Sequence, residues 1–329
     1  MSTSLAQHAG MQVYLTSAYS DVEPIGAFRR AAAADKYGVH RLTDDPAEAD
    51  LILFAENSQY HNDRFFKILK NHPLVRQYPN KAFMYNPHDL PWLVLPGLYP
   101  SMPASLFDEA SVAASPYMEQ VNDRIRCDFA AEPQLLYSFC GNLRMPVRSE
   151  LQQLQHPRGD VREAAQGLYL DHKPLEPLVA YANLLVDTKF MLCPRGIGSS
   201  SIRLFETMQA GRVPVVIADE WVRPKGPAWD DFAVFVPQNQ IAQIPRLLES
   251  IEAQWPVMSR LARANWERYF APDVIFHYFV EQLLPLRTTN KRMGFSLARS
   301  HDAQFARYYV RSKFLHPARN WVAALQQKR

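Results

Sequence analysis

Long apolar runs are missing from this sequence. None of its stretches reaches the roughly 18 consecutive apolar residues of a membrane span. The N-terminal stretch MSTSLAQHAGMQVYLTSAYSD has neither the basic nor the apolar segment of a secretory signal. Acceptor triplets for N-glycosylation are also absent. We therefore expect a cytoplasmic protein.

Cysteine is scarce as well. The three thiols, Cys127, Cys140 and Cys193, are too few and too scattered for a disulfide framework, and none belongs to a Cys-x-x-Cys pair. We expect them to be small buried apolar side chains.

Glycine is also sparse, whereas proline is abundant. Only 12 glycines but 25 prolines occur in the 329 residues. So many prolines fit numerous short loops at strand ends better than long uninterrupted helices. The composition favours an α/β protein, and the length favours two domains of about 150 residues each.

Negative charge is nearly absent from the C-terminal segment. Residues 287–329 hold ten Lys or Arg and one acid, Asp302, so the rest of the chain is acidic in balance. The segment FARYYVRSKFLHPARNWVAAL suits an anionic membrane surface or an acidic partner, or a closing helix whose aromatic side chains pack on the body. A nucleic-acid role is disfavoured because these aromatics follow no recognised module.

Short apolar runs typical of strands alternate with helical patterns along the chain. Units of about 30 residues with this alternation predict parallel strands with helices on both faces of a sheet. Strands are predicted at 11–19, 49–57, 81–86, 111–115, 134–142, 189–196, 212–221 and 232–237. Helices are predicted at 24–38, 63–77, 146–155, 174–188, 200–211, 240–254, 256–269 and 272–285.

The alternation is interrupted near residues 117–135 and then restarts. We therefore expect two Rossmann-like, doubly wound α/β domains that face each other across a cleft. Residues 1–130 form the first, residues 131–285 the second, and residues 286–329 a basic helical tail that packs back on the first. Ligands bind at the carboxyl ends of strands in open parallel sheets, so site residues should directly follow strands.

One loop after a predicted strand is suited to an anion. After FMLC the chain reads PRGIGSSS (194–201), and the helix that follows carries Arg203 and Glu206. A serine cap, uncapped N–H groups and the helix dipole favour negative charge there, and Gly196 and Gly198 permit positive φ and close approach to a ligand. The Gly-Lys-Ser/Thr ending of a P-loop and the Gly-x-Ser-x-Gly motif of a serine hydrolase are both absent.

Charged side chains surround this loop. Arg195 and Arg203 flank the turn, and Arg144 and Arg148 follow the FCGN strand end as a second cationic clamp for a diphosphate. Glu206, one or two turns into the helix, is placed to accept two ribose hydroxyls. The alternative is an ordinary helix cap with solvated side chains. The predicted set is Asn142, Arg144, Arg148, Arg195, Gly196, Gly198, Ser199, Ser200, Ser201, Arg203 and Glu206.

The segment YANLLVDTKFMLCPRGIGSSSIRLFETMQAGRVPVVIADEWVRP resembles the exostosin family of glycosyltransferases, family 47. The segments DPAEADLILFAE, FCGNLRMPVRSEL and WDDFAVFVP are similar to the same family. The resemblance implies a GT-B fold, a nucleotide-sugar donor held by the second domain, an acceptor cleft on the first, and inversion at the anomeric carbon. Glu206 corresponds to the second glutamate of the Glu-x7-Glu motif of related enzymes, and Gly198 takes the place of the first.

We therefore expect an inverting glycosyltransferase of the hexosyl or glycuronosyl type, with a UDP-sugar as the favoured donor. The metal-chelating Asp-x-Asp of the other common glycosyltransferase fold is absent, so neither a metal nor a cofactor is expected. Arginines and N–H dipoles would stabilise the leaving diphosphate instead.

The resemblance is incomplete. Animal exostosins carry an N-terminal membrane anchor, and many members have an Asp-His pair after a Trp in the first domain. This sequence has His88-Asp89 in the reverse order after a strand. We expect a bacterial member acting on a glycan or lipid-linked oligosaccharide in surface polysaccharide synthesis, in the cytoplasm or at the inner face of its membrane.

The general base of such a transfer must lie across the cleft from the donor. Glu56 ends the strand ADLILFA, and His88 and Asp89 follow the strand KAFMYN. All three remain candidates, with Glu56 favoured by its strand-end position and a loop cap as its structural alternative. Asp219 and Glu220, after the strand VPVVI, are predicted sugar contacts.

A second class of function stays open. A catalytically inactive glycan-binding protein, or a partner subunit of another glycosyltransferase, would have the same fold. It would bind an acceptor without turning over a donor.

Overall fold

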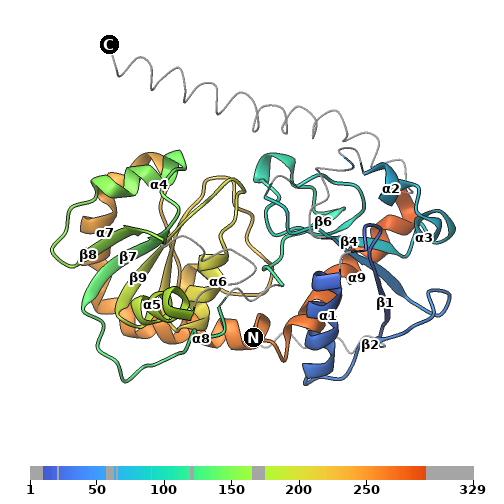
Figure 1. The fold of residues 1–329 in the computed structure, drawn as a ribbon, viewed down its shortest axis with the longest axis horizontal. Helices are drawn as coiled ribbons and strands as arrows, with labels where there is room; N and C mark the ends of the chain where they lie inside the picture. The colour runs from blue at the N-terminus through green and yellow to red at the C-terminus, as the bar shows by residue number, and fades with distance from the viewer. Residues whose placement is uncertain are drawn as a thin grey trace, which may run out of the picture.

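The computed structural model describes residues 10–20, 22–56, 63, 66–89, 91–118, 122–164 and 175–293, with side chains to residue 288. The molecule has two lobes, each built on one parallel sheet with helices on both faces (Figure 1). Two such α/β lobes facing each other form the GT-B architecture. The fold prediction is therefore confirmed.

The first sheet contains six strands in the order β2-β1-β3-β4-β5-β6, and every neighbouring pair is parallel. Its central strands are continuous apolar runs because both faces are covered. The strands are β1 (Gln12–Thr16), β2 (Arg41–Leu42), β3 (Leu51–Ala55), β4 (Ala82–Tyr85), β5 (Gly97–Leu98) and β6 (Val112–Ala113).

Side chains of successive strand residues point to opposite faces of this sheet. Leu53 packs into the apolar cluster of α1 and α9, whereas its neighbour Phe54 packs into the cluster of the two short helices on the other face. The helices are α1 (Val22–Ala34), α2 (Lys67–Lys70), α3 (Pro73–Gln77) and α9 (Ile275–Met293).

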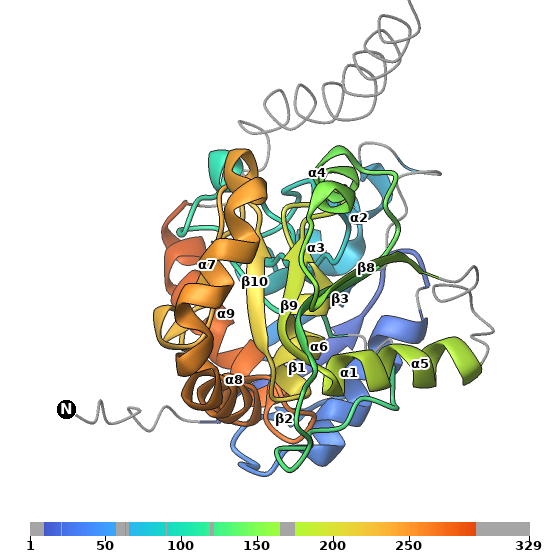
Figure 2. The same cartoon turned by 90° about the vertical axis from the view of Figure 1, so that its left-hand side faces the viewer.

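The second sheet has five parallel strands in the order β11-β10-β9-β7-β8. Figure 2 looks onto this lobe, with α5 and α7 on opposite sides of the sheet. The strands are β7 (Leu135–Gly141), β8 (Gly159–Glu163), β9 (Thr188–Pro194), β10 (Val213–Ile217) and β11 (Val234–Phe235). The helices are α4 (Pro146–Glu150), α5 (Leu175–Val186), α6 (Ile202–Gln209), α7 (Ile244–Ile251) and α8 (Trp255–Tyr269).

Helix α9 returns the chain from the second lobe to the first. It begins at Ile275, shortly after α8, and packs on α1, β5 and β6. The ring of Phe279 lies 5.6 Å from that of Phe28 and 5.9 Å from that of Tyr85, measured between centroids. One buried apolar cluster includes side chains of both lobes. Residues 275–285, which we assigned to the second domain, therefore lie with the first.

Three short strands are absent from our prediction. The two-residue strands β2 and β5 are too short to show a period, and β5 directly follows a proline. The edge strand β8 has partly or fully exposed side chains and so lacks the apolar pattern of a covered strand.

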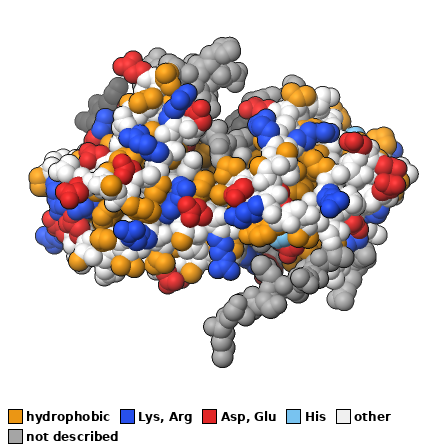
Figure 3. Space-filling view, turned by 90° about the horizontal axis from the view of Figure 1, so that it is seen from below, with side chains coloured by type: hydrophobic (Ala, Val, Ile, Leu, Met, Phe, Trp, Pro, Cys, Tyr) orange, Lys and Arg blue, Asp and Glu red, His pale blue; other side chains and the backbone are white. Residues whose placement is uncertain are grey.

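Charged and apolar side chains are mixed on one face of the molecule (Figure 3). On the face drawn in Figure 3, Lys and Arg side chains are interspersed with Asp and Glu side chains and with apolar ones. Among the described residues, no helix is both long and apolar enough to cross a membrane. Residues 294–329 of the basic tail, to which we assigned membrane or partner contacts, lie outside the described residues.

One fully buried arginine connects the second lobe to the segment between the two sheets. The guanidinium of Arg212 donates to the carbonyl oxygens of Val186 at 2.7 Å, Gly211 at 3.0 Å and Asp128 at 3.0 Å. Burial lowers the pKa of Arg212, whereas the neighbouring Cys127, Asp128 and Asp187 act in the opposite direction. The hydrogen bonds thus fix the connecting segment at Asp128.

Replacing Arg212 by Met keeps much of the apolar stem but removes the donor of these carbonyl groups. A buried unsatisfied polar group costs about 1–3 kcal/mol. We expect Arg212→Met to lower the free energy of unfolding by about 3 kcal/mol, as measured by urea denaturation.

The matched control is Arg260→Met. The Arg260 guanidinium lies on the surface, 4.9 Å from the centroid of the Phe129 ring, and its loss should change stability by less than about 0.5 kcal/mol. Equal effects of the two substitutions would contradict the structural role of Arg212.

Candidate active site

The predicted anion-binding segment joins β9 to α6 at the carboxyl edge of the second sheet. Residues 195–201, here called the anion loop, follow Pro194 at the end of β9 and precede Ile202 at the start of α6. Helix α6 is followed by Gly211, whose φ of +64° is the left-handed conformation that glycine readily adopts. This helix end agrees with the prediction.

The three serines of the anion loop are buried. The Ser199 hydroxyl donates to the carbonyl of Ser101 in the first lobe at 2.9 Å. The hydroxyls of Ser200 and Ser201 have no hydrogen-bond partner within the described residues. Ser201 is the N-cap residue of α6, but its side chain makes no capping bond, so the expected serine cap is wrong at this position. Two buried hydroxyls at the helix start therefore have unused bonding capacity.

The two glycines of the anion loop allow close packing against other parts of the protein. Neither Gly196 nor Gly198 adopts the positive φ that glycine permits. A Cβ on Gly196 would lie 2.9 Å from the Arg148 guanidinium. A Cβ on Gly198 would lie 2.7 Å from Ser101 Oγ and 2.9 Å from Asp89 Oδ1. Side chains from both lobes thus occupy the space that a larger residue would need.

The anion loop contains one predicted arginine, Arg195, and two others lie beside it. Arg148 donates from Nε to the carbonyl of Arg195 at 3.1 Å. Arg203 is buried, donates from Nε to the carbonyl of Cys140 at 2.8 Å, and places its guanidinium over the Phe139 ring. The arrangement concentrates positive charge at the carboxyl ends of β7 and β9.

The two other residues predicted to bind the donor after β7 lie on the surface. Asn142 and Arg144 are exposed, and the Asn142 side chain accepts the N–H of Arg144 at 2.8 Å. The Asn142 carbonyl accepts from Arg148 at 3.4 Å. This turn after β7 thus helps to orient Arg148.

Asp89 reaches the anion loop from the first lobe. It follows β4, and its carboxylate accepts a hydrogen bond from the N–H of Gly198. Burial raises the pKa of Asp89, whereas the positive charge of Arg148 and the Gly198 hydrogen bond act in the opposite direction. Asp89 is thus a predicted base whose contacts include the anion loop.

The other two predicted bases lie at the same edge of the first sheet. Glu56 is buried at the end of β3, where its carboxylate accepts from the Ser17 hydroxyl at 2.6 Å and the Ala18 N–H at 2.7 Å. These bonds hold the chain that follows β1. The His88 N–H donates to the side chain of Asn86 at 3.1 Å in the turn after β4.

Glu206 lies beside a cavity of about 470 Å³ between the lobes. The cavity walls come from α1, α6, the end of α8 and the segment that includes Tyr117 and Asn122. The Tyr181 hydroxyl of α5 donates to Glu206 Oε2 at 2.9 Å. Ile202 also lines the cavity, so the cavity begins where the anion loop ends.

The two acids after β10 make hydrogen bonds with backbone groups. The Glu220 carbonyl accepts the N–H of Ala104 at 2.8 Å, and its carboxylate accepts the N–H of Ser105 at 2.9 Å. Both partners belong to the first lobe. Asp219 accepts the N–H of Gln238 at 3.0 Å. The predicted sugar contact Glu220 thus serves as a connection between the lobes.

Two residues of this site were missed from the sequence. Ser101 follows the unpredicted strand β5, so no pattern pointed to it. Tyr181 lies on the apolar side of a predicted helix, where a buried hydroxyl needs a partner. That signal was present, but it did not identify Glu206 as the partner.

The exostosin GT47 domain matches residues 70–251, more than half of the chain, including the anion loop and Glu206. The chain belongs to the exostosin GT47 family. The resemblance seen in the sequence is confirmed.

Curated relatives match this exostosin GT47 chain over part of its length. Exostosin-1 of Drosophila melanogaster is 31% identical over 112 residues, which cover 32% of this chain and 15% of that protein. The Exostosin-1 homolog of Caenorhabditis elegans is 40% identical over 114 residues, or 34% of this chain and 30% of that protein. Exostosin-2 of Homo sapiens is 36% identical over 93 residues, or 27% and 13%. The matched segments thus span less than a third of these relatives.

The solved structures that match this chain are distant in sequence. A crystal structure of an α1,3-fucosyltransferase has a TM-score of 0.45 and 12% identity, covering 90% of this chain and 94% of that one. Anabaena HepE, in complex with UDP and glucose, has a TM-score of 0.38 and 10% identity, covering 83% and 99%.

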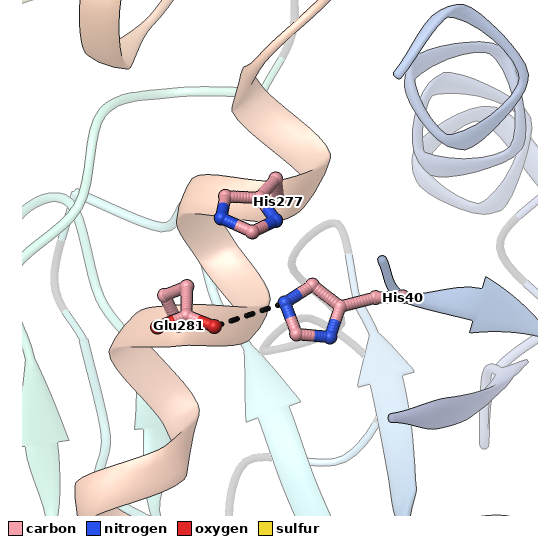
Figure 4. A group of neighbouring side chains, drawn as sticks. All are labelled: His40, His277 and Glu281. Atoms are coloured by element: carbon pink, nitrogen blue, oxygen red, sulfur yellow. Dashed lines mark hydrogen bonds and ion pairs between the residues drawn. The ribbon is translucent and has the colours of Figure 1, made fainter. Parts of the chain in front are cut away.

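A separate polar cluster of this exostosin GT47 chain lies where α9 packs on the first lobe (Figure 4). His277 and Glu281 project from α9 toward His40. The Nε2 atom of His40 lies 3.0 Å from Glu281 Oε1, and its ring stacks on that of His277 with centroids 4.8 Å apart. One ligand atom of each residue lies within 4.8 Å of the others, a spacing compatible with a metal ion.

The hydrogen bonds of His40 favour a different role for this cluster. The N–H of Met11 donates to His40 Nδ1 at 3.2 Å, so Nε2 carries the proton and donates to Glu281. A metal on Nε2 would require the proton on Nδ1, directly opposite the Met11 N–H. The cluster is therefore better described as a neutral-histidine contact that holds α9 on the first lobe.

Stability should fall on acidification because of this contact. Burial, followed by the charge of His277, lowers the pKa of His40, whereas Glu281 and Asp35 act in the opposite direction. A histidine with a lowered folded-state pKa contributes stability above its ordinary pKa of about 6.5 and loses it as the pH falls through the folded value.

We expect His40→Gln, which keeps an N–H for Glu281 but does not titrate, to flatten the decrease in melting temperature between pH 7.5 and 5.5. The difference between wild type and variant should correspond to about 1 kcal/mol in the free energy of unfolding. Parallel melting profiles of wild type and variant would contradict this assignment.

Proposed function

We propose that this protein is an inverting, metal-independent glycosyltransferase. It transfers a hexosyl or glycuronosyl group from a nucleotide-sugar, with a UDP-sugar favoured, to a glycan or lipid-linked oligosaccharide in surface polysaccharide synthesis. Membership of the exostosin GT47 family supports sugar transfer. The observation that carries the proposal is the anion loop, with two unpartnered buried hydroxyls at a helix start and arginines around it.

The diphosphate of the donor would lie over the first turn of α6. Ser200 and Ser201 offer hydroxyl donors, and the N–H groups of the helix start favour an anion. Arg195, Arg203 and Arg148 supply the positive charge that a metal ion would otherwise provide. The absence of Asp-x-Asp from the sequence fits this metal-independent arrangement.

The nucleoside would extend from the anion loop into the cavity beside Glu206. The cavity volume of about 470 Å³ lies within the usual range for small-molecule sites. A carboxylate can accept hydrogen bonds from two ribose hydroxyls, and the Tyr181 hydroxyl fixes the orientation of Glu206. We therefore assign ribose recognition to Glu206, with Tyr181 as its positioning residue.

The acceptor hydroxyl would approach from the first lobe. A base removes its proton while the acceptor oxygen bonds to the anomeric carbon and the nucleoside diphosphate leaves from the opposite side, which inverts the configuration. Of the three predicted bases, Glu56, His88 and Asp89, we favour Asp89 because its carboxylate reaches the anion loop. Its raised pKa also makes it a better proton acceptor than an ordinary aspartate.

Donor recognition can be tested by thermal shift with UDP-, GDP- and CMP-sugars. We expect one of them to raise the melting temperature, because a ligand that binds the folded state stabilises it by mass action. The shift should persist in EDTA. Absence of a shift with every donor would favour the inactive glycan-binding or partner-subunit alternative.

The nucleoside assignment predicts a graded response at two positions. Glu206→Gln should raise the KM for the donor at least tenfold, because it removes a charged acceptor worth about 1.5–3 kcal/mol. Tyr181→Phe should raise it by a smaller factor, because the carboxylate stays in place but loses its orienting bond. Steady-state kinetics of donor turnover measure both.

Glu249→Gln provides the control, since this glutamate lies on α7 and accepts from His156 at 3.0 Å, away from the cavity. It should leave the donor KM unchanged. An unchanged KM in Glu206→Gln would refute the ribose assignment.

A further inference from the structure

A negatively charged side chain from the first lobe contacts the anion loop. The carboxylate of Asp89 accepts the N–H of Gly198, and its Oδ1 lies 2.9 Å from the position of a Cβ on that glycine. Asp89 belongs to the first lobe and Gly198 to the second. The carboxylate thus reaches the anion loop from the other lobe, at a residue shortly before α6 begins.

The groups around this carboxylate are those expected for a bound phosphate. Its charge interacts with Arg148, the arginine whose Nε binds the Arg195 carbonyl at 3.1 Å and whose guanidinium lies against Gly196. A backbone N–H and a guanidinium are the usual donors to a phosphate oxygen. A carboxylate oxygen satisfies the same donors with the same sign of charge.

A diphosphate and an ionised carboxylate cannot share these donors, because like charges at contact distance repel strongly. We propose that Asp89 occupies the anion position of the loop in the free protein and that the donor diphosphate displaces it. This inference rests on the proposed function. Displacement releases the Asp89 carboxylate on the first-lobe side of the cleft, where the acceptor hydroxyl must arrive.

The displacement need not separate the lobes. Pro103 and Trp221 form a β-bridge across the interface, and the Glu220 carbonyl accepts the N–H of Ala104 at 2.8 Å. These contacts do not involve Asp89. Release of the carboxylate therefore changes the anion loop locally and connects donor binding to the availability of the base.

Protonation of Asp89 should have the same effect as its displacement. Burial raises the pKa of Asp89, against the opposing effects of Arg148 and the Gly198 hydrogen bond. Ser101 of the first lobe flanks the same glycine, and its Oγ is 2.7 Å from the Tyr117 hydroxyl. Because a protonated carboxyl competes less with an anion, diphosphate affinity should increase as the pH falls through this raised pKa.

Isothermal titration calorimetry with UDP and with GDP tests the proposal on the full chain. Asp89→Asn keeps the size of the side chain and removes its charge. We expect this variant to bind the accepted nucleoside diphosphate about tenfold more tightly than wild type at pH 8, the effect of losing one competing charge-assisted hydrogen bond. The ratio of the two affinities should approach one as the pH is lowered.

Glu109→Gln is the matched control. Glu109 is a first-lobe acid that pairs across the interface with Lys225 at 3.7 Å, away from the anion loop. Its neutralisation should leave the affinity at the wild-type value at every pH. Equal tightening in Glu109→Gln and Asp89→Asn would overturn the proposal, because it would indicate a general effect of net charge.

The remaining outcomes separate this inference from the proposed function. If wild type binds a nucleoside diphosphate and Asp89→Asn binds it equally or more weakly, the displacement model is wrong but the donor site stands. If neither protein binds UDP or GDP, both the displacement model and the proposed use of these donors fail. Circular dichroism of each variant verifies that it is folded.

Discussion

Parallel strand pairing is the constraint on which this site depends. Because every strand within a sheet runs in the same direction, all of the loops that follow the strands gather along one edge. In the first lobe this edge carries Glu56, Asp89 and Ser101, and in the second it carries Arg148 and the anion loop. The lobes present these edges to each other, so residues separated by about a hundred positions in the chain come into hydrogen-bond contact.

The interface between the lobes combines two kinds of interaction. Near the crossing of α8 into α9, a buried apolar cluster is shared by both lobes and gives the contact its stability. At the strand ends the contacts are polar and involve backbone groups, such as the bond from Ser199 to the Ser101 carbonyl. Because the buried apolar cluster is separate from the polar contacts at the strand ends, the charged groups there can rearrange without exposing the core.

Most of the fold and part of the site could be predicted from the sequence. Long apolar strands such as β3 and β9 were predictable because burial on both faces requires continuous apolar residues, and the Gly-Ser segment was recognisable because it directly follows one of them. The contact of Asp89 with Gly198 was not predictable, because it depends on how the two sheets face each other. The unused capping position of Ser201 was equally hidden, since a serine before a helix normally predicts a capping bond.

The buried guanidinium of Arg212 also determines where relative motion of the lobes can occur. By binding the carbonyl of Asp128, it makes the last part of the connecting segment move with the second sheet. A rotation between the lobes must then be taken up on the β6 side of Asp128 and at the passage from α8 to α9. Both of these places line the cavity beside Glu206, so a small rotation would alter the width of this cavity more than the geometry of either sheet.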